Sequence, residues 1–354
     1  FARNGNTTPR YSVYNGSAWG ANTAFPSSIG GEATFVMCRP CPVRNEVLLV
    51  MQDDQRDVNV SSYNGSSWGS VTEICTDTGQ LNYRPVDVAY EALSGTALIV
   101  YWKEASTRYV YRTWNGTALS GETVMPALSG ATDARWATLF ARPKSNDLIL
   151  LAQYKNGSNM LAACVWSGGA WGAWTTLTSN LGTDANECYS LEFEGLSNTA
   201  LAVYSESGQS QPRYRTWNGT SWSTQGSMSS IGATAQWVRL TADPSSDLIL
   251  MVALDANDDL EANRWTGSSW VGNQQFESNT GGHNSRRLDL CFEPGGTGRA
   301  LLLYRERKSN RPMYRVWDGS AWGSELSGPN IKRKLERVQV VPGGSAGELF
   351  VACS

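Results

Sequence analysis

Histidine is almost missing from this chain of 354 residues, which has only His283. One histidine excludes metal sites built from several imidazoles and leaves little room for a Ser-His-Asp triad. Charge is also sparse, because Asp, Glu, Lys and Arg make up 17% of the residues, against about 25% in an average globular protein. The 29 basic residues form no long cluster and the formal net charge is −3. The sequence therefore lacks the basic footprint of a duplex-nucleic-acid binder.

Long apolar runs and sustained helical periods are absent as well. No run approaches the length of about 18 residues that a membrane span needs, and no basic-then-apolar leader opens the chain. We therefore expect no direct membrane insertion of this chain. Because it starts with Phe1 and not Met, we expect a processed or trimmed extracellular or cell-surface protein whose signal or anchor lies upstream.

A short motif recurs seven times: an aromatic residue, a small polar residue and glycine. The aromatic positions are Tyr14, Tyr63, Trp114, Trp166, Trp217, Trp265 and Trp317. Their spacings are 49, 51, 52, 51, 48 and 52 residues. Five residues after the aromatic, six copies carry a tryptophan and the third copy carries Leu119. Seven periods account for the whole chain, which predicts a single domain made of repeats.

Each repeat predicts four short strands. The Asn-Gly of segments such as 213–222, flanked by alternating aromatic and polar residues, predicts a type I′ hairpin between the third and fourth strands. An apolar run such as 300–304 predicts the second strand, and an alternating segment such as 237–244 predicts the first. The same hairpins explain most Asn-x-Ser/Thr sequons without glycosylation.

Units of this kind bury their faces only by packing on their neighbours, so we expect a seven-bladed β-propeller with four-stranded antiparallel blades. The expected repeats are approximately residues 31–79, 80–130, 131–182, 183–232, 233–282, 283–332, and 333–354 plus 1–30. The last blade is split, with two strands from each terminus, and its closure would hide the sheet edges. The same closure between molecules would give a swapped dimer or a fibre, so self-assembly stays open.

Alignment of the seven expected first strands gives two columns. The first is polar and would lie at the mouth of a central channel: Glu32, Arg84, Arg135, Glu187, Gln236, Arg286 and Glu336. The second, four residues further on, is apolar and predicts core: Val36, Val88, Leu139, Leu191, Leu240, Leu290 and Val340. The polar column is interpreted as inter-blade ion pairs, Glu32 with Arg84, Arg135 with Glu187 and Arg286 with Glu336, with a polar funnel for a ligand as the alternative.

Tryptophans outside the repeat positions are candidates for ligand binding, namely Trp102, Trp136, Trp174 and Trp237. A ring near Arg239 and Asp289 could stack on a sugar face while these polar groups bond its hydroxyls. Packing between blades is the alternative. The loop with Arg305, Arg307, Lys308 and Arg311 is a basic patch suited to an anionic partner, or simply a solvated loop.

Other chemistry has weaker support. Channel carboxylates such as Asp87, Glu187 and Asp289 could serve a glycosidase, but each lies in a repeat column beside a basic or polar neighbour, so we expect no enzyme. Asp255, Asn257 and Asp259 have the spacing of a calcium loop. Leu260 stands where that loop needs glycine, and the similar segment 53–57 favours a plain turn. We expect no cofactor, with calcium as the one alternative.

The seven cysteines include one Cys-x-x-Cys, Cys38 and Cys41. This pair is not followed by a second pair, so zinc is disfavoured, and we expect either a local disulfide or two idle thiols. The odd total argues against a full disulfide framework.

The hairpins with their trailing tryptophan resemble the Asp-box of sialidase-type propellers, although only Trp317-Asp318-Gly319 has the Asp and no sialidase catalytic residue can be carried over. As a whole the chain resembles secreted bacterial seven-bladed propellers of the lectin-like and cell-surface type. This resemblance implies a non-enzymatic recognition or adhesion module whose partner is a glycan or a surface protein. The alternatives are the outer domain of a surface appendage or pilus-like filament, and a glycoside-active enzyme.

Overall fold

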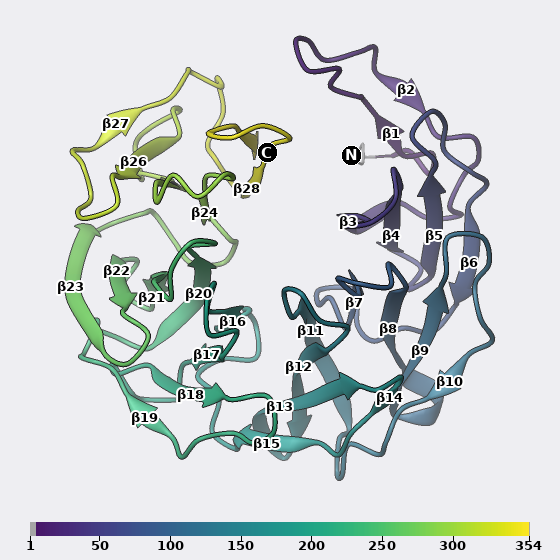
Figure 1. The fold of residues 1–354 in the computed structure, drawn as a ribbon, viewed down its shortest axis with the longest axis horizontal. Helices are drawn as coiled ribbons and strands as arrows, with labels where there is room; N and C mark the ends of the chain where they lie inside the picture. Colours follow the sequence, from purple (N-terminus) through teal and green to yellow (C-terminus); the bar gives the residue numbers. More distant parts are fainter. Residues whose placement is uncertain (1–4, 354) are drawn as a thin grey trace. The chain divides into compact units, whose positions relative to one another are not determined.

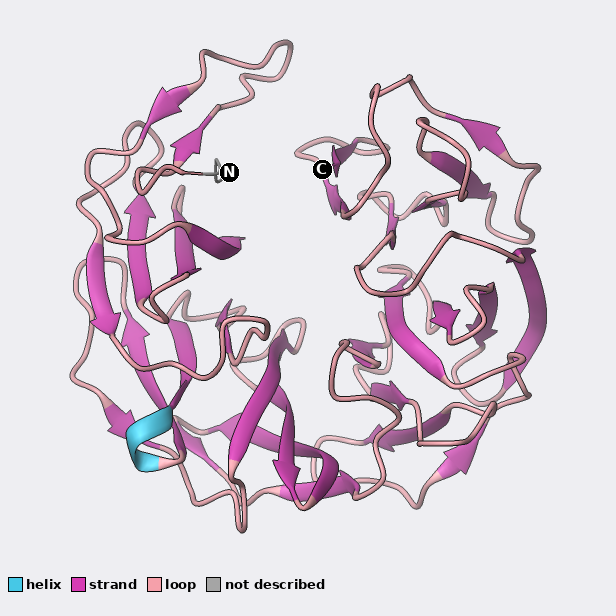
Figure 2. Cartoon of the chain, turned by 180° about the vertical axis from the view of Figure 1, so that it is seen from behind, coloured by secondary structure: helices cyan, strands magenta, loops and turns pink. Residues whose placement is uncertain are grey.

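The computed structural model describes residues 5–353 and divides the chain into two compact units, residues 1–179 and 180–354. Nearly all regular structure in the described part is β-strand; the short 3-10 helix η1 (Glu104–Ser106) is the helical segment drawn in Figure 2. Within residues 5–353, no helix is long and apolar enough to cross a membrane. The assignment of the whole chain to a single domain stays a prediction.

The first unit holds one two-stranded sheet and three larger antiparallel sheets, which Figure 1 shows in chain order. The hairpin consists of β1 (Arg10–Tyr11) and β2 (Thr23–Ala24). Blade 1 consists of β3 (Ala33–Pro40), β4 (Val47–Asp53), β5 (Val58–Tyr63) and β6 (Thr72–Cys75). Blade 2 consists of β7 (Val86–Tyr90), β8 (Ala97–Lys103), β9 (Arg108–Trp114) and β10 (Thr123–Val124). Blade 3 consists of β11 (Asp133–Ala141), β12 (Leu148–Asn156), β13 (Ser158–Ser167), β14 (Ala170–Trp171) and β15 (Thr175–Thr178).

The second unit holds three four-stranded antiparallel sheets and a final hairpin. Blade 4 consists of β16 (Tyr189–Phe193), β17 (Ala200–Tyr204), β18 (Arg213–Trp217) and β19 (Gly226–Ser227). Blade 5 consists of β20 (Ala235–Ala242), β21 (Ile249–Asp255), β22 (Leu260–Trp265) and β23 (Trp270–Glu277). Blade 6 consists of β24 (Leu288–Phe292), β25 (Ala300–Tyr304), β26 (Met313–Trp317) and β27 (Leu326–Ser327). The hairpin consists of β28 (Val338–Pro342) and β29 (Leu349–Cys353).

The chain is thus all-β, with the blades of a β-propeller. In blades 1, 2, 4, 5 and 6 the four strands pair in chain order, as the repeat predicts, whereas in blade 3 both β14 and β15 pair with β13. The seventh repeat supplies the two hairpins β1–β2 and β28–β29, one in each unit. Their union into a single closing blade stays a prediction, and its expected start at Phe1 lies outside the described residues.

The motif glycines do form the hairpins between third and fourth strands, but the predicted type I′ turn is wrong for most of them. In blade 4, Trp217 and Trp222 form a β-bridge that closes a turn of four residues. Gly219 in this turn has a positive φ of +101°. Asn218 is not among the residues with positive φ; its side-chain oxygen accepts the backbone N–H groups of residues 220 and 221. Only blade 3, where Ser167 pairs with Ala170 across two positive-φ glycines, has the two-residue type I′ geometry.

Core packing follows the predicted apolar column with one error of register. Six of its members are 5% exposed or less, but Val36 is 41% exposed. The strand pairing identifies the shift in register but does not account for the exposure, because Cys38 is exposed as well. In blade 3, Leu148 pairs with the hairpin residue Trp166, and the residue two places after Leu148 pairs with Leu139. In blade 1, the residue at the equivalent place pairs with Cys38. Cys38 is therefore the true counterpart of Leu139.

The same two-residue shift applies to Glu32 in the polar column. β-bulges fall at equivalent places, between Ala134 and Trp136 in blade 3 and between Ala33 and Phe35 in blade 1. Arg135 is the extra residue of its bulge, and Thr34 is its counterpart. Because the bulge occurs in both blades, it leaves their spacing equal, and the misplacement of Glu32 follows from the same choice of Val36 in place of Cys38.

In blades 3 and 5 the second tryptophan of the repeat lies in the seam with the preceding blade. Trp171 of blade 3 contacts Tyr111 of blade 2 with ring centroids 6.2 Å apart. Trp270 of blade 5 contacts Tyr214 of blade 4 at 6.0 Å. These tryptophans therefore bury the blade faces that a single repeat leaves exposed.

Candidate functional site

Three of the four tryptophans proposed for sugar stacking are buried, and the fourth, Trp174, is half-buried and donates its indole N–H to the carbonyl of Pro126 at 2.8 Å. Trp102 is 0%, Trp136 7% and Trp237 4% exposed. The Trp102 indole N–H donates to Glu104 at 2.8 Å, and the Trp237 indole N–H donates to the carbonyl of His283 at 2.8 Å. A stacking platform needs an open ring face, so the alternative interpretation, packing inside the fold, describes these residues better.

Arg239 and Asp289 form a contact between blades. The Arg239 guanidinium donates to Asp289 at 3.1 Å, and the second carboxylate oxygen of Asp289 accepts the backbone N–H of Val340 at 2.9 Å. Asp87 makes the same pair of contacts in the first unit, with Arg39 at 3.4 Å and the backbone N–H of Leu139 at 3.0 Å. Each aspartate therefore joins the blade before it to the blade after it.

The polar column is partly buried and hydrogen-bonded. In the first unit, Arg84 donates to the carbonyl of Ala137 at 2.6 Å, and Arg135 lies over the Tyr83 ring at 4.2 Å. In the second unit, Gln236 accepts from Asn186, Arg286 donates to the carbonyl of Val338, Glu187 is 4% exposed, and Glu336 pairs with Arg287 and Arg305. A channel mouth would need both units, so its ligand-funnel role stays a prediction.

The basic loop is smaller than expected. Arg305 is 4% exposed and donates to Glu336 at 3.1 Å, so it belongs to the interior. Arg307 and Arg311 are exposed, and Arg311 donates to the carbonyl of Gly328.

The candidate calcium loop is a turn closed by backbone hydrogen bonds. One oxygen of Asp255 accepts the N–H groups of Asn257 and Asp259, and the other accepts that of Ala233. Asp53 is used in the same way in blade 1. Among residues 5–353 no group of three or more His, Cys, Asp or Glu side chains could hold a metal ion. The cysteines of the described part are free thiols, Cys38 exposed and Cys41 buried.

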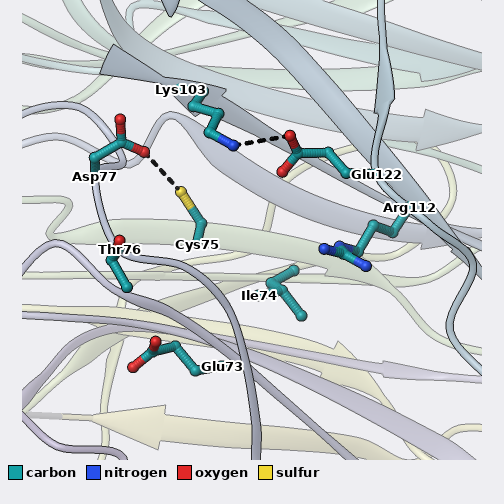
Figure 3. Close-up of a pocket in the computed structure, with 8 residues that line it drawn as sticks. All are labelled: Glu73, Ile74, Cys75, Thr76, Asp77, Lys103, Arg112 and Glu122. Atoms are coloured by element: carbon teal, nitrogen blue, oxygen red, sulfur yellow. Dashed lines mark hydrogen bonds and ion pairs between the residues drawn. The ribbon is translucent and has the colours of Figure 1, made fainter. Parts of the chain in front are cut away.

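A polar cleft lies between blades 1 and 2, inside the first unit, and sequence analysis did not single it out. Its volume is about 360 Å³. Strand β6 and the residues after it supply one wall, and strands β8 and β9 with Glu122, just before β10, supply the other; Figure 3 shows the lining side chains. Its lining residues are Glu73, Ile74, Cys75, Thr76, Asp77, Lys103, Arg112 and Glu122.

A hydrogen-bonded chain fixes the blade 2 side of the cleft. The Arg112 guanidinium donates to the Tyr101 hydroxyl at 3.2 Å and to the carbonyl of Ser120 at 2.9 Å. Tyr101 donates to one oxygen of Glu122 at 2.9 Å, and the Lys103 ammonium donates to the other at 2.9 Å. Tyr101 is fully buried, and its hydroxyl is hydrogen-bonded to both Arg112 and Glu122, so it fixes the positions of both side chains.

The protonation states in the cleft follow from these contacts. Burial acts to raise the pKa of Glu122, but hydrogen bonds from Lys103 and Tyr101 outweigh it and hold the pKa below its ordinary value. The hydrogen bond to Glu122 raises the pKa of Lys103. Burial, with the Asp77 carboxylate next to it, raises the pKa of the Cys75 thiol to about 12. At neutral pH the cleft therefore presents an ionised Glu122, a charged Lys103 and an unreactive thiol.

The sequence did contain a signal for these residues. Relative to the hairpin aromatic, blade 2 has Tyr, Arg and Glu at positions −13, −2 and +8, and blade 6 has Tyr304, Arg315 and Glu325 at the same positions. Blade 4 has Tyr204, Arg215 and Gln225 there. Because the pattern occurs in alternate repeats, a search for a feature common to all seven misses it.

No protein-family model matches the chain, and no curated protein matches it. Solved structures do match. The BP39L lectin from Burkholderia pseudomallei has a TM-score of 0.68 at 13% identity, covering 92% of this chain and 93% of that one. A polysaccharide lyase, an ulvan lyase, has a TM-score of 0.53 at 11% identity and covers 91% and 92%. The β-propeller domain of the trilobed protease from Pyrococcus furiosus has 0.51 at 10% identity and covers 90% and 95%. The chain thus shares its β-propeller fold with lectins and with propellers that belong to enzymes.

Proposed function

We propose that this protein is a non-enzymatic saccharide-binding module and that the cleft between blades 1 and 2 holds the sugar. The observation that carries the proposal is the fixed pair of a guanidinium, Arg112, and an ionised carboxylate, Glu122, on the wall of an open cleft. A sugar hydroxyl both donates and accepts, so it can accept from Arg112 while donating to Glu122. Ile74 also lines the cleft, but at 8% exposed it offers a sugar ring little apolar surface.

The similarity to the BP39L lectin supports the same proposal at the level of fold. The fold does not decide the ligand, because function depends on the site.

The state of the carboxylates favours binding over hydrolysis. A glycosidase needs one carboxylic acid that stays protonated to donate to the leaving group. In the cleft, Glu122 has a lowered pKa and donates nothing. Asp87 and Asp289, two of the channel carboxylates considered from sequence, are occupied by guanidinium and backbone N–H partners. A catalytic role for these three groups would require them to lose their partners.

A glycan array followed by titration calorimetry tests the proposal. We expect Arg112→Ala to weaken binding of the best array ligand by about tenfold or more. Arg108→Ala is the matched control, because Arg108 is an exposed arginine on the same strand outside the cleft. Equal affinity of the two variants would refute the cleft assignment.

The array also separates the alternatives left open by the sequence. No binding to any glycan, together with concentration-dependent assembly, would favour a structural subunit of a surface appendage. Turnover of a glycoside would favour an enzyme. The extracellular location fits a glycan-binding role and is part of the proposal.

A further inference from the structure

Two loops of the second unit are strongly basic. The first, residues 305–311, links β25 to β26, and the second, residues 331–337, links β27 to β28. Together they contain eight Lys and Arg residues and two Glu residues. The chain as a whole has a formal net charge of −3. Positive charge is therefore concentrated in these loops, and the rest of the chain is net negative.

Hydrogen bonds hold the two loops against each other. The backbone N–H of Ile331 donates to the carbonyl of Asn310 at 3.0 Å. The Arg305 guanidinium donates to the carbonyl of Leu335 at 3.3 Å. The end of the first loop thus meets the start of the second, and the start of the first meets the end of the second. Their basic side chains therefore belong to one surface of the protein.

The glutamate of the second loop is bound by arginines of the interior. One carboxylate oxygen of Glu336 accepts from Arg287 at 2.8 Å, and the other accepts from Arg305 at 3.1 Å. The side chains of these arginines are only 10% and 5% exposed. Burial acts to raise the pKa of Glu336, but the two arginines outweigh it and hold the pKa below its ordinary value. Glu336 thus balances charge inside the fold and leaves the outer cations of the loops without this anion.

Seven basic side chains lie on the outside of the two loops, and we call them the basic surface. They are Arg307, Lys308, Arg311, Lys332, Arg333, Lys334 and Arg337, all of them exposed. In the described part of the chain, no acidic side chain forms an ion pair with Arg307, Lys308 or residues 332–334. A group of exposed cations without counter-charges attracts an anionic partner and speeds its association.

The kind of partner follows from what the loops lack. Neither loop contains an aromatic residue, so the bases of a single-stranded nucleic acid would have nothing to stack on. Among the described residues, neither loop exposes a large apolar side chain that could anchor in a lipid surface. A nucleic-acid duplex is stiff, so it would extend beyond the basic surface over a chain that is otherwise net negative.

We propose that the basic surface binds a sulfated polysaccharide. A flexible polysaccharide can follow both loops, and its successive sulfate groups then contact Arg307 and Lys308 on one loop and residues 332–334 on the other. Guanidinium groups bond two oxygens of such an anion at once, and ammonium groups act as point charges. The saccharide cleft belongs to the first unit, so this inference does not depend on the proposed function.

The test compares dextran sulfate with uncharged dextran of the same length, by titration calorimetry. We expect the wild-type chain to bind dextran sulfate and not dextran, and a rise in salt of about fourfold to weaken binding by about tenfold or more. The triple variant Lys332→Gln, Arg333→Gln, Lys334→Gln should weaken binding by about tenfold or more. Arg307→Gln with Lys308→Gln, on the other loop, should also weaken it, because the two loops act as one surface.

The matched control removes three positive charges from scattered exposed positions, with Arg108→Gln, Lys144→Gln and Arg299→Gln. It has the same net charge as the triple variant and should bind dextran sulfate as the wild type does. Lys332→Arg with Lys334→Arg keeps the charge and should keep the affinity. Equal weakening in the triple variant and its control would show an effect of net charge alone and would overturn the inference, as would absence of binding to dextran sulfate.

Three further probes distinguish a sulfated polysaccharide from other polyanions: phosphatidylserine vesicles, duplex DNA and polyglutamate. We expect each to bind more weakly than dextran sulfate at the same concentration of negative charge. Equal or tighter binding of any of them would overturn the choice of partner. Arg112→Ala tests the saccharide cleft separately, so a failure of one proposal is distinguishable from a failure of the other.

Discussion

At the scale of single residues, the surroundings of a carboxylate decide its charge. Glu122 is held ionised by an ammonium and a hydroxyl. Glu261 of blade 5 is 6% exposed, and its Oε2 atom has no hydrogen-bond partner among the described residues. Burial, with Asp255 and Asp259 nearby, raises its pKa from 4.5 to about 7. The same type of side chain is thus a fixed anion in one blade and mainly neutral in another below pH 7.

Glu261 should make stability depend on pH. Because its pKa in the folded state lies above the ordinary value of 4.5, the fold favours the protonated form. Its contribution is fully present below pH 4.5 and is lost as the pH rises to about 7. We expect Glu261→Gln to raise the free energy of unfolding above neutral pH by about 1–2 kcal/mol and to flatten this part of the profile. Denaturant unfolding across this pH range measures both effects, and identical profiles for the variant and wild type would contradict the prediction.

Trp270 should contribute to stability through the seam that it fills. It contacts Tyr214 of the preceding blade and Trp265 of its own. We expect Trp270→Ala to lower the free energy of unfolding by about 2–4 kcal/mol, because a large ring is removed from a packed boundary. Leu93→Ala, at a position 61% exposed, is the control and should change it by less than about 0.5 kcal/mol. Similar losses in the two variants would show that the seam is not the source of the effect.

The sequence predicted the residues that pack in the core better than the residues that line the candidate site. The sequence showed that Trp136 and Trp237 occur at equivalent places, but not that both are buried. Burial depends on the neighbouring blade, which a repeat read in isolation does not contain. Arg112 and Glu122 were overlooked because their partner Tyr101 lies 11 and 21 residues away in the chain and becomes adjacent only when the blade forms.

At the scale of elements, the hairpin shows what a local pattern can and cannot predict. The pattern located every turn between third and fourth strands, because glycine is required where φ is positive. It predicted the wrong turn type, because Asn218 accepts backbone N–H groups with its side chain. Asp318 does the same in blade 6. An Asx-type turn of this kind explains why Asp can replace Asn there.

Gly319 tests the conformational demand of this turn. Its φ is +103°, and an added Cβ would meet only the carbonyl oxygen of Gly298 at 3.6 Å, an ordinary contact. We expect Gly319→Ala to destabilise the protein by about 1–3 kcal/mol through backbone strain alone. Gly121→Ala, where φ is not positive and the space is open, should be within about 0.5 kcal/mol of wild type. Thermal unfolding of both variants measures the difference, which would be absent if the turn tolerated a side chain.

Strand register was the other limit at this scale. The first strands of six blades were aligned correctly because an apolar residue marks each core position. Blade 1 failed because Cys38 holds that position and Val36, two residues earlier, has the more apolar side chain. A shift of two keeps a residue on the same face of a strand, so alternation gives no warning of it.

At the scale of the whole molecule, the repeat predicts that the two units together form one compact domain. A single domain of this length should have a radius of gyration of about 20 Å. Small-angle scattering of the monomer measures it directly. A clearly larger radius, or two separate unfolding transitions, would contradict the prediction that the chain is one closed domain.

The central claim is that the cleft between blades 1 and 2 is a sugar-binding site. The most direct measurement is a crystal structure of the protein with the best ligand from the glycan array. The account predicts a sugar ring at this boundary, with its hydroxyls bonded to the Arg112 guanidinium and the Glu122 carboxylate. A ligand bound elsewhere on the blades, with Arg112 and Glu122 still solvent-facing, would contradict it.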